Sequence, residues 1–429
     1  MCASSYQISP QTQLTIALLH WGDLIEDFLD SIGVSFEGFC KEMTGGWMFG
    51  YIDALQLAGV RTVLFCVSAR VSTPTRYTHL PTGATICVLP APKRYRAIHR
   101  PMVRGVSYLL SAVLRDIAPY LATPLRILAH ELRQEGCQAI LCQEYEYARF
   151  DLCVLLGRLI GLPVFATFQG GDFQMSRLER PLRPFSMQAG AGFIVATQTE
   201  VQRVQSRYGV PSSKIAKIFN PLDLSIWDEG DRVTTRTALG IPLEAEVVVW
   251  HGRIDLRRKG LDILTAAWEQ VCRDRPERDL RLLLVGTGSD ADKLHQQISQ
   301  MELRGVIWIN EYILDRTAIR NYLSAADIYT LPSRHEGFPV APLEAMACGL
   351  PVVATDAPGV PDILEKGELS GGLVVPREDA TALALALGRV LDDPAWRREL
   401  GKRARHRVEM SFSLEAVGKQ LRDFLFRDS

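Results

Sequence analysis

The chain has 429 residues, of which 47% are hydrophobic, and its formal net charge is −1. This length exceeds that of a usual single domain, so two α/β domains of about 200 residues each are expected. The absence of a basic surplus argues against a nucleic-acid-binding protein, because a phosphate backbone must be neutralised by lysine and arginine.

The cysteines predict a reducing compartment. There are nine of them, they are scattered, and no two have the C-x-x-C spacing of a zinc or redox motif. Several lie inside apolar runs, where a free thiol behaves as a small hydrophobic group. The first residues lack the layout of a secretory signal, and the most apolar stretch, near residues 105–128, is interrupted by charged residues and prolines. We therefore expect a cytoplasmic protein that at most rests on a membrane surface.

In the first half, short apolar runs alternate with segments of helical periodicity, a pattern typical of parallel sheets with crossover helices. The predicted strands cover residues 14–21, 62–68, 85–90, 138–144, 163–169 and 192–199. The predicted helices cover residues 47–57, 103–135, 149–160 and 200–208.

The second half repeats this pattern. Its predicted strands cover residues 246–252, 281–288, 306–310, 327–333 and 350–356, and its predicted helices cover 259–274, 290–300, 316–326, 342–349 and 381–393. The fold class is therefore α/β, with two Rossmann-like, doubly wound parallel-sheet domains that face a cleft. We expect an N-terminal domain over residues 1–219, a C-terminal domain over 220–409, and a helix over 410–429 that packs back across the junction.

Two cations flank the loop after the strand at 246–252. Gly252-Arg253 follows this strand directly, and Lys259-Gly260 precedes the next helix. An arginine fork and a mobile lysine ammonium can converge on one diphosphate. The alternative is a solvated basic loop, since Arg257 and Arg258 lie there too.

Two glutamates follow the strand at 327–333. Glu336 lies in the loop, and Glu344 lies just inside a helix that Pro342 helps to start. Carboxylates accept from sugar hydroxyls, and the backbone N–H groups between them can face phosphate oxygens. The alternative, a glutamate that merely complements a helix dipole, explains neither the second glutamate nor the loop of glycine and proline.

In these features the chain resembles retaining glycosyltransferases of the GT-B fold, family four. The resemblance rests on the two glutamates, the Gly252-Arg253 and Lys259-Gly260 pairs, and the following segment GLPVVATD. The resemblance implies that Arg253 and Lys259 hold the donor diphosphate, Glu344 the ribose and Glu336 the transferred sugar. Arg253, Lys259 and Glu336 are thus the candidate catalytic residues. Further donor-binding residues implied in this half are Gly252, Gly286, Gly288, Gly337, Phe338 and Pro339. For Gly286 and Gly288 a plain turn is the alternative.

The first half matches this family less closely. The glycine pair that such enzymes place near the donor phosphate has Gly45-Gly46 as its candidate here, followed by Trp47 as an acceptor-site candidate and preceded by an unusual insertion. Where the family often has a histidine, this chain has Gln169, which cannot titrate, followed by Asp172. Both are acceptor-site candidates, and Asp172 has a helix-capping role as its alternative. Glu144 and Glu146 end a predicted strand and are candidates for the same site.

No metal-ligand pattern is evident, so no cofactor and no metal ion are expected. The resemblance implies a retaining hexosyltransferase that uses a nucleotide sugar, with a UDP-sugar first and GDP-mannose second, and in which the leaving diphosphate serves as the base. The acceptor is a hydroxyl group on a glycan, lipid or small natural product. A nucleotide-sugar epimerase and a two-lobed, non-catalytic binding protein remain alternatives. The basic run at residues 93–104 could touch anionic lipid, with a solvated loop as its alternative.

Overall fold

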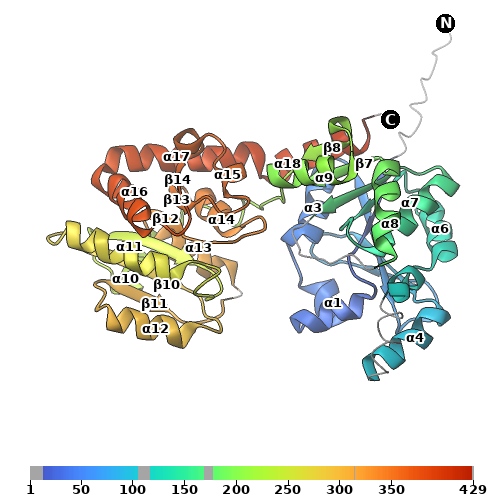
Figure 1. Cartoon of the computed structure of the whole chain (residues 1–429), viewed down its shortest axis with the longest axis horizontal. Coiled ribbons are helices and arrows are strands. Elements are labelled where there is room, and N and C mark those ends of the chain that lie inside the picture. Colours follow the sequence, from blue (N-terminus) through green and yellow to red (C-terminus); the bar gives the residue numbers. More distant parts are fainter. Residues whose placement is uncertain (1–12, 105–115, 169–176, 314, 428–429) are drawn as a thin grey trace, which may run out of the picture.

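The computed structural model describes residues 13–104, 116–168, 177–313 and 315–427. Figure 1 shows two α/β domains, the N-terminal one at the right and the C-terminal one at the left, with helices α17 and α18 running along the top from one to the other. Each domain is built on its own sheet, so the prediction of two doubly wound α/β units is confirmed.

The N-terminal sheet has the order β3-β4-β2-β1-β5-β6-β7-β8. All its neighbouring strands are parallel except β3, which runs antiparallel to β4. Strands such as TIALL in β1 are buried along their whole length, because helices cover both faces of the sheet. Its strands are β1 (Thr15–Leu19), β2 (Arg61–Ser68), β3 (Thr75–Thr78), β4 (Thr85–Pro90), β5 (Ala139–Cys142), β6 (Val164–Phe168), β7 (Gly192–Val195) and β8 (Ile215–Lys217).

The helices of this domain form two layers. Side chains of α6, α7, α8 and α9 share one buried cluster with the sheet, and those of α1, α2, α3 and α18 share the other. The helices are α1 (Ile25–Ile32), α2 (Phe36–Lys41), α3 (Gly46–Leu57), α4 (Lys93–Arg104), α6 (Leu125–Gln134), α7 (Ala148–Ile160), α8 (Glu179–Ala189) and α9 (Gln198–Tyr208), with a 3₁₀ turn η1 (Ser212–Lys214).

Three expectations for this domain need correction. Strand β3 was not predicted, because its TRYT sequence is polar and it lies exposed at the edge of the sheet. The single helix expected over 103–135 is interrupted before α6, where Pro124 lacks the N–H that a continuous helix needs. The basic run at 93–104 is helix α4, so its interpretation as a loop was wrong.

The C-terminal sheet is entirely parallel, with the order β11-β10-β9-β12-β13-β14. Its strands are β9 (Glu246–His251), β10 (Leu280–Val285), β11 (Val306–Ile309), β12 (Ile328–Leu331), β13 (Val352–Thr355) and β14 (Gly372–Val375). Strand β14 was not predicted.

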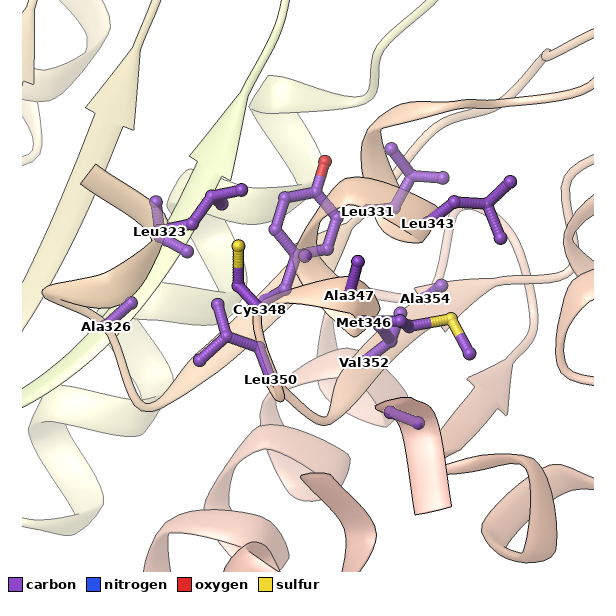
Figure 2. Close-up of a cluster of buried hydrophobic side chains, with 14 of the residues drawn as sticks. Leu323, Ala326, Leu331, Leu343, Met346, Ala347, Cys348, Leu350, Val352 and Ala354 are labelled. Atoms are coloured by element: carbon purple, nitrogen blue, oxygen red, sulfur yellow. The ribbon is translucent and has the colours of Figure 1, made fainter. Parts of the chain in front are cut away.

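Helices cover both faces of this sheet too. They are α10 (Arg232–Ala238), α11 (Leu261–Asp274), α12 (Ala291–Gln300), α13 (Arg316–Ser324), α14 (Ala341–Ala347), α15 (Val360–Ile363), η2 (Gly367–Ser370), α16 (Ala380–Asp392) and α17 (Pro394–Ser411). The helix that follows, α18 (Leu414–Leu425), returns to the N-terminal domain. Figure 2 shows Leu343, Met346 and Ala347 of α14 among the buried side chains of one face. This packing fixes the short helix that carries Glu344.

The two domains touch at several points. Helix α18 packs on α3, so closely that a side chain at Gly418 would lie 2.0 Å from the carbonyl oxygen of Ala54. Two hydrogen bonds also join the domains: Asp362 accepts from the backbone N–H of Gln198 at 2.9 Å, and Arg316 donates to the carbonyl oxygen of Thr44 at 3.2 Å. Among the described residues, no helix is long and apolar enough to cross a membrane.

Candidate functional site

The candidate residues of the C-terminal domain meet at the carboxyl edge of its sheet. Strand β9 lies between β10 and β12, so the loops that follow these three strands are neighbours. They carry Arg253 and Lys259 after β9, Gly286 and Gly288 after β10, and Glu336 after β12. This edge is where open parallel α/β sheets bind their ligands.

Lys259 and Glu336 form the centre of this cluster. The Lys259 Nζ lies 2.8 Å from Glu336 Oε1 and 2.9 Å from Glu336 Oε2. Glu336 is only 6% exposed, and its Oε1 also accepts from the Ser333 hydroxyl at 2.6 Å. These three hydrogen bonds hold the carboxylate of Glu336 in one orientation.

Positive charge remains available beside this pair. An ammonium group has three N–H bonds, and Glu336 uses two of those on Lys259. Arg253 is exposed, and the described part of the chain offers its guanidinium no hydrogen bond or ion pair. Both cations can thus donate to an anion in the loop region.

Glu344 is held by a histidine that the sequence interpretation left without a role. Its Oε2 lies 2.8 Å from His251 Nε2. The ring of the buried Tyr329 lies edge-on to that of His251, with 5.4 Å between centroids. Burial raises the pKa of Tyr329 well above its ordinary value, and the charges of Glu344 and Glu336 add to this effect. The phenol therefore stays protonated beside the two carboxylates.

The glycines after β10 have a steric reason. A side-chain carbon at Gly286 would lie 2.0 Å from the carbonyl oxygen of Gly252, and one at Gly288 would lie 2.2 Å from that of Ile254. Gly286 also has a φ of +130°, which other residues rarely adopt. These glycines let two neighbouring loops touch, so they do more than form a plain turn.

A cavity of about 230 Å³ opens next to the cluster. It is lined by Trp250, His251, Gly252, Lys259, Leu331, Glu336, Phe338, Pro339, Val340 and Ala341. The ring of Phe338 stacks on that of Phe219 at the domain junction, with 5.4 Å between centroids. The carbonyl of Gly337 lies against Gly359, where a side-chain carbon would approach it to 2.8 Å. The loop from Gly337 to Pro339 is thus packed in place beside the cavity.

Gly45 reaches the same region from the N-terminal domain. It precedes α3, whose first residue is Gly46, and has a φ of +64°. It lines a cavity of about 610 Å³ between the domains together with Glu344. The guanidinium of Arg316 covers Gly45, where a side-chain carbon would lie 2.6 Å from Arg316 Nη2. The structure therefore brings Gly45 and Glu344 to one cavity, with Arg316 between the domains.

The structure describes only some of the acceptor-site candidates. Gln169 and Asp172 lie outside the described residues, as does the side chain of Trp47. Glu144 is half-buried at the end of β5, and its Oε1 accepts from the backbone N–H of Glu146 at 3.2 Å.

Glu146 is part of a buried ion-pair network. Its Oε1 accepts from Arg203 Nη1 at 2.6 Å, and Arg203 Nε donates to Glu200 at 2.7 Å. Burial raises the pKa of Glu146, and the Arg203 guanidinium partly offsets this. Glu146 therefore holds Arg203 in place instead of facing a ligand directly.

Arg203 is a site residue that the sequence interpretation missed. It lines an interdomain cavity of about 350 Å³ together with Glu336 of the other domain. Thr197, Thr199 and His335 line it as well. Thr197 and Thr199 end a predicted strand and Arg203 lies in the predicted helix that follows, but only the relative placement of the domains brings them opposite Glu336.

Within the described ranges, no three His, Cys, Asp or Glu side chains gather as a metal site would require. Eight cysteines fall in those ranges, and all are buried free thiols.

Residues 245–393 match the family model described as glycosyl transferases group 1. The chain is 30% identical over 237 residues to a D-inositol 3-phosphate glycosyltransferase of Kineococcus radiotolerans, a match that covers 52% of this chain and 54% of the relative. It is 32% identical over 247 residues to a GDP-mannose-dependent monoacylated α-(1-6)-phosphatidylinositol monomannoside mannosyltransferase of Corynebacterium glutamicum, covering 53% of this chain and 60% of that one. The chain thus spans little more than half the length of these curated relatives.

Solved structures match almost the whole chain. HepE of Anabaena in complex with UDP aligns with a TM-score of 0.67 at 16% identity, covering 96% of this chain and 99% of that one. Sucrose-phosphate synthase from Thermosynechococcus elongatus aligns with a TM-score of 0.63 at 23% identity, covering 97% and 100%. These likenesses establish the GT-B architecture. The match to the glycosyl transferases group 1 family thus lies in the C-terminal domain, over residues 245–393.

Proposed function

We propose that this protein transfers a hexose-type sugar from a nucleoside diphosphate sugar to a hydroxyl acceptor, with retention of anomeric configuration and without a metal ion. The observation that carries this proposal is the convergence of Lys259, Glu336 and Glu344 on the loops beside Arg253, at the carboxyl edge of the C-terminal sheet. The family match over residues 245–393 supports it, since the match contains all four residues.

In this proposal, the four side chains bind different parts of the donor. Arg253 and the third N–H of Lys259 donate to the diphosphate, and Glu344, oriented by His251, accepts from the ribose hydroxyls. Glu336 retains acceptor capacity beyond its bonds to Lys259 and Ser333, so it can accept from a sugar hydroxyl. The loop from Gly337 to Pro339 borders the cavity in which this sugar would lie.

The chemical step then needs charge stabilisation more than a protein base. The bond from the anomeric carbon to the diphosphate oxygen breaks, and the acceptor oxygen bonds to that carbon on the same face. The acceptor proton passes to an oxygen of the leaving diphosphate. Arg253 and Lys259 stabilise the negative charge that develops there, which is the role usually worth most in such sites. Glu336 is already engaged by the ammonium of Lys259 at 2.8 Å and by the Ser333 hydroxyl, so the proposal assigns it to donor binding.

The donor nucleotide is proposed as UDP first and GDP second. HepE, whose fold this chain shares, is described as a UDP complex, and the Corynebacterium relative is described as GDP-mannose-dependent. The acceptor belongs to the classes of glycan, lipid or small natural product, and its side of the site includes Arg203 and the N-terminal edge of the 350 Å³ cavity. The buried thiols suit a cytoplasmic enzyme.

A thermal-shift panel of UDP, GDP and ADP, each with and without a chelator, tests this proposal. We expect one nucleoside diphosphate to raise the melting temperature, and the chelator to leave that rise unchanged. Turnover of the matching sugar nucleotide, followed by NMR of the product, should then show a retained anomeric configuration. An epimerised donor without transfer, or binding without turnover, would support the epimerase or the binding protein instead. A rise that disappears with the chelator would contradict a metal-free site.

A further inference from the structure

Helices α7 and α8 carry an apolar surface that the donor site does not use. Leu159 is 75% exposed and Phe185 is 74% exposed, and Leu155, Leu178 and Leu182 are exposed as well. Isolated exposed leucines are normal, but a group on two adjacent helices usually marks an interaction surface. We call these five side chains the α7–α8 patch.

The two helices that carry the patch are neighbours. Asp151 of α7 lies 3.4 Å from Arg183 of α8, so α7 and α8 pack against each other. Leu155 and Leu159 are four residues apart and therefore share an exposed face of α7. Leu178, Leu182 and Phe185 are spaced by four and three residues and share an exposed face at α8. Figure 1 shows α6, α7 and α8 as neighbours on the outer side of the N-terminal domain.

Among the described residues, the exposed charged side chains of α6, α7 and α8 near the patch are positive. Arg158 on α7 and Arg177 and Arg180 at the start of α8 are exposed, and so are Arg126 and Arg133 on the neighbouring α6. The carboxylates of α7 and α8, Asp151 and Glu179, are both buried. Between residues 116 and 190, the described residues include no fully exposed carboxylate. Because the whole chain has a formal net charge of −1, this excess of arginine is a local feature and does not reflect a basic overall composition.

We propose that the α7–α8 patch docks the protein on an anionic membrane surface. Apolar side chains within a ring of arginines fit the boundary between headgroups and acyl chains, where leucine and phenylalanine enter the apolar layer and arginine pairs with lipid phosphates. A protein partner for this patch would need an acidic rim, whereas a second copy would bring arginine against arginine. This inference goes beyond the proposed function, because docking requires no glycosyl transfer.

The test is co-sedimentation of the full chain with vesicles of phosphatidylcholine alone and of phosphatidylcholine with phosphatidylglycerol. We expect binding to the anionic vesicles only, weakened by salt. Replacing Arg158 and Arg180 with Gln should lower the partition coefficient about fivefold for each arginine. Phe185→Ser should lower it about tenfold or more, since an apolar side chain then no longer enters the bilayer.

Matched controls come from the C-terminal domain. Leu385 on α16 is 67% exposed, and Arg398 on α17 is also exposed, so Leu385→Ser and Arg398→Gln change the same residue types at another surface. They should leave vesicle binding unchanged. A third variant, Lys93→Gln with Arg94→Gln, examines the basic helix α4. Unchanged thermal melts and nucleotide binding will show that each variant is folded.

Several outcomes would overturn the proposal. These are no binding to anionic vesicles, equal binding to neutral ones, or a loss of binding in the α4 variant alone. A dimer in size-exclusion chromatography that Phe185→Ser dissociates would assign the patch to self-association instead.

Discussion

The ammonium of Lys259 and the guanidinium of Arg253 differ in how the protein holds them. Lys259 is fixed by both oxygens of Glu336, whereas Arg253 is exposed at the mouth of the loop. A fixed charge stabilises a developing negative charge without reorganisation, and a mobile fork can follow the diphosphate as it leaves.

Replacing either cation should therefore lower turnover. We expect Lys259→Ala and Arg253→Ala each to lower kcat about a hundredfold or more, by comparison with the loss of one oxyanion donor. Steady-state kinetics with the preferred sugar nucleotide measures this. Arg257→Ala is the matched control, because Arg257 is an exposed cation on the same loop. Near-normal turnover in both variants would remove these residues from the mechanism.

His251 acts through Glu344, so its loss should affect donor binding more than the chemical step. We expect His251→Phe to raise the KM for the donor about tenfold and to leave kcat nearly unchanged, since a hydrogen bond to a charged group is lost equally in the ground and transition states. His251→Gln, which can still donate to Glu344, should restore most of the affinity. A fall in kcat at unchanged KM would contradict this role.

The residues that could be predicted from the sequence share one property. Arg253, Lys259, Glu336 and Glu344 lie in short segments where loop chemistry is visible locally. His251 and Arg203 were missed, because their importance depends on partners far away in the sequence, Glu344 and Glu146. Glu146 was assigned to the acceptor site for the same reason, since nothing local shows that it is paired.

At the scale of elements, the contact between the loops after β9 and β10 shapes the donor site. Gly286→Ala would drive a carbon to within 2.0 Å of the Gly252 carbonyl at a φ that favours glycine. We expect a loss of about 2–3 kcal/mol in the free energy of unfolding and much weaker nucleotide binding. Denaturant titration and calorimetry measure the two effects.

Gly367→Ala is the control for this substitution. Gly367 has a φ of +52° but no atom within 4 Å of the added carbon, so only backbone strain of about 1 kcal/mol should appear. An equal loss in the free energy of unfolding in Gly286→Ala and Gly367→Ala would show that the contact between the loops after β9 and β10 does not contribute to stability.

Helix α3 contributes an acidic residue whose ionisation is unfavourable. Burial raises the pKa of Asp53 to about 6, and the charge of Asp223 adds to this shift. Because the folded-state pKa exceeds the unfolded value of 3.8, stability is fully present below that value and falls as pH rises through about 6.

Asp53→Asn should abolish this fall. With solvent screening of this half-exposed group taken into account, we expect a gain of about 1 kcal/mol in the free energy of unfolding above pH 6 and none near pH 4. Chemical denaturation at the two pH values compares them. A gain that is the same at both would show that the charge of Asp53 is not its cause.

Most elements could be predicted because buried strands and amphipathic helices have clear periodicities. Several elements were not predicted. Strand β3 is polar and exposed, β14 is short, and α17 lies in a stretch of charged residues. Helices α1, α2, α8 and α10 were not predicted either, although α1 and α8 are amphipathic. Helix α4 was not predicted as a helix, because its run of basic residues masks the apolar signal of the buried Tyr95.

At the scale of the whole molecule, two domains and a returning helix create the cleft. Helix α18 packs against α3, while Asp362 and Arg316 form hydrogen bonds across the junction. Sequence periodicity could predict both sheets, but it carries no information on how the two domains face each other. For this reason the pairing of Gly45 with Arg316, and of Arg203 with Glu336 across one cavity, emerged only from the structure.

The central claim is that the C-terminal domain grips a diphosphate through Arg253 and Lys259. Calorimetry of the preferred nucleoside diphosphate and of its monophosphate, with the wild-type protein and Lys259→Ala, tests it most directly. We predict that the wild type binds the diphosphate at least about tenfold more tightly, and that Lys259→Ala loses most of this preference, because the charge-assisted bonds to the second phosphate are gone. An unchanged preference in Lys259→Ala, or no binding of any nucleoside diphosphate to the wild type, would contradict the account.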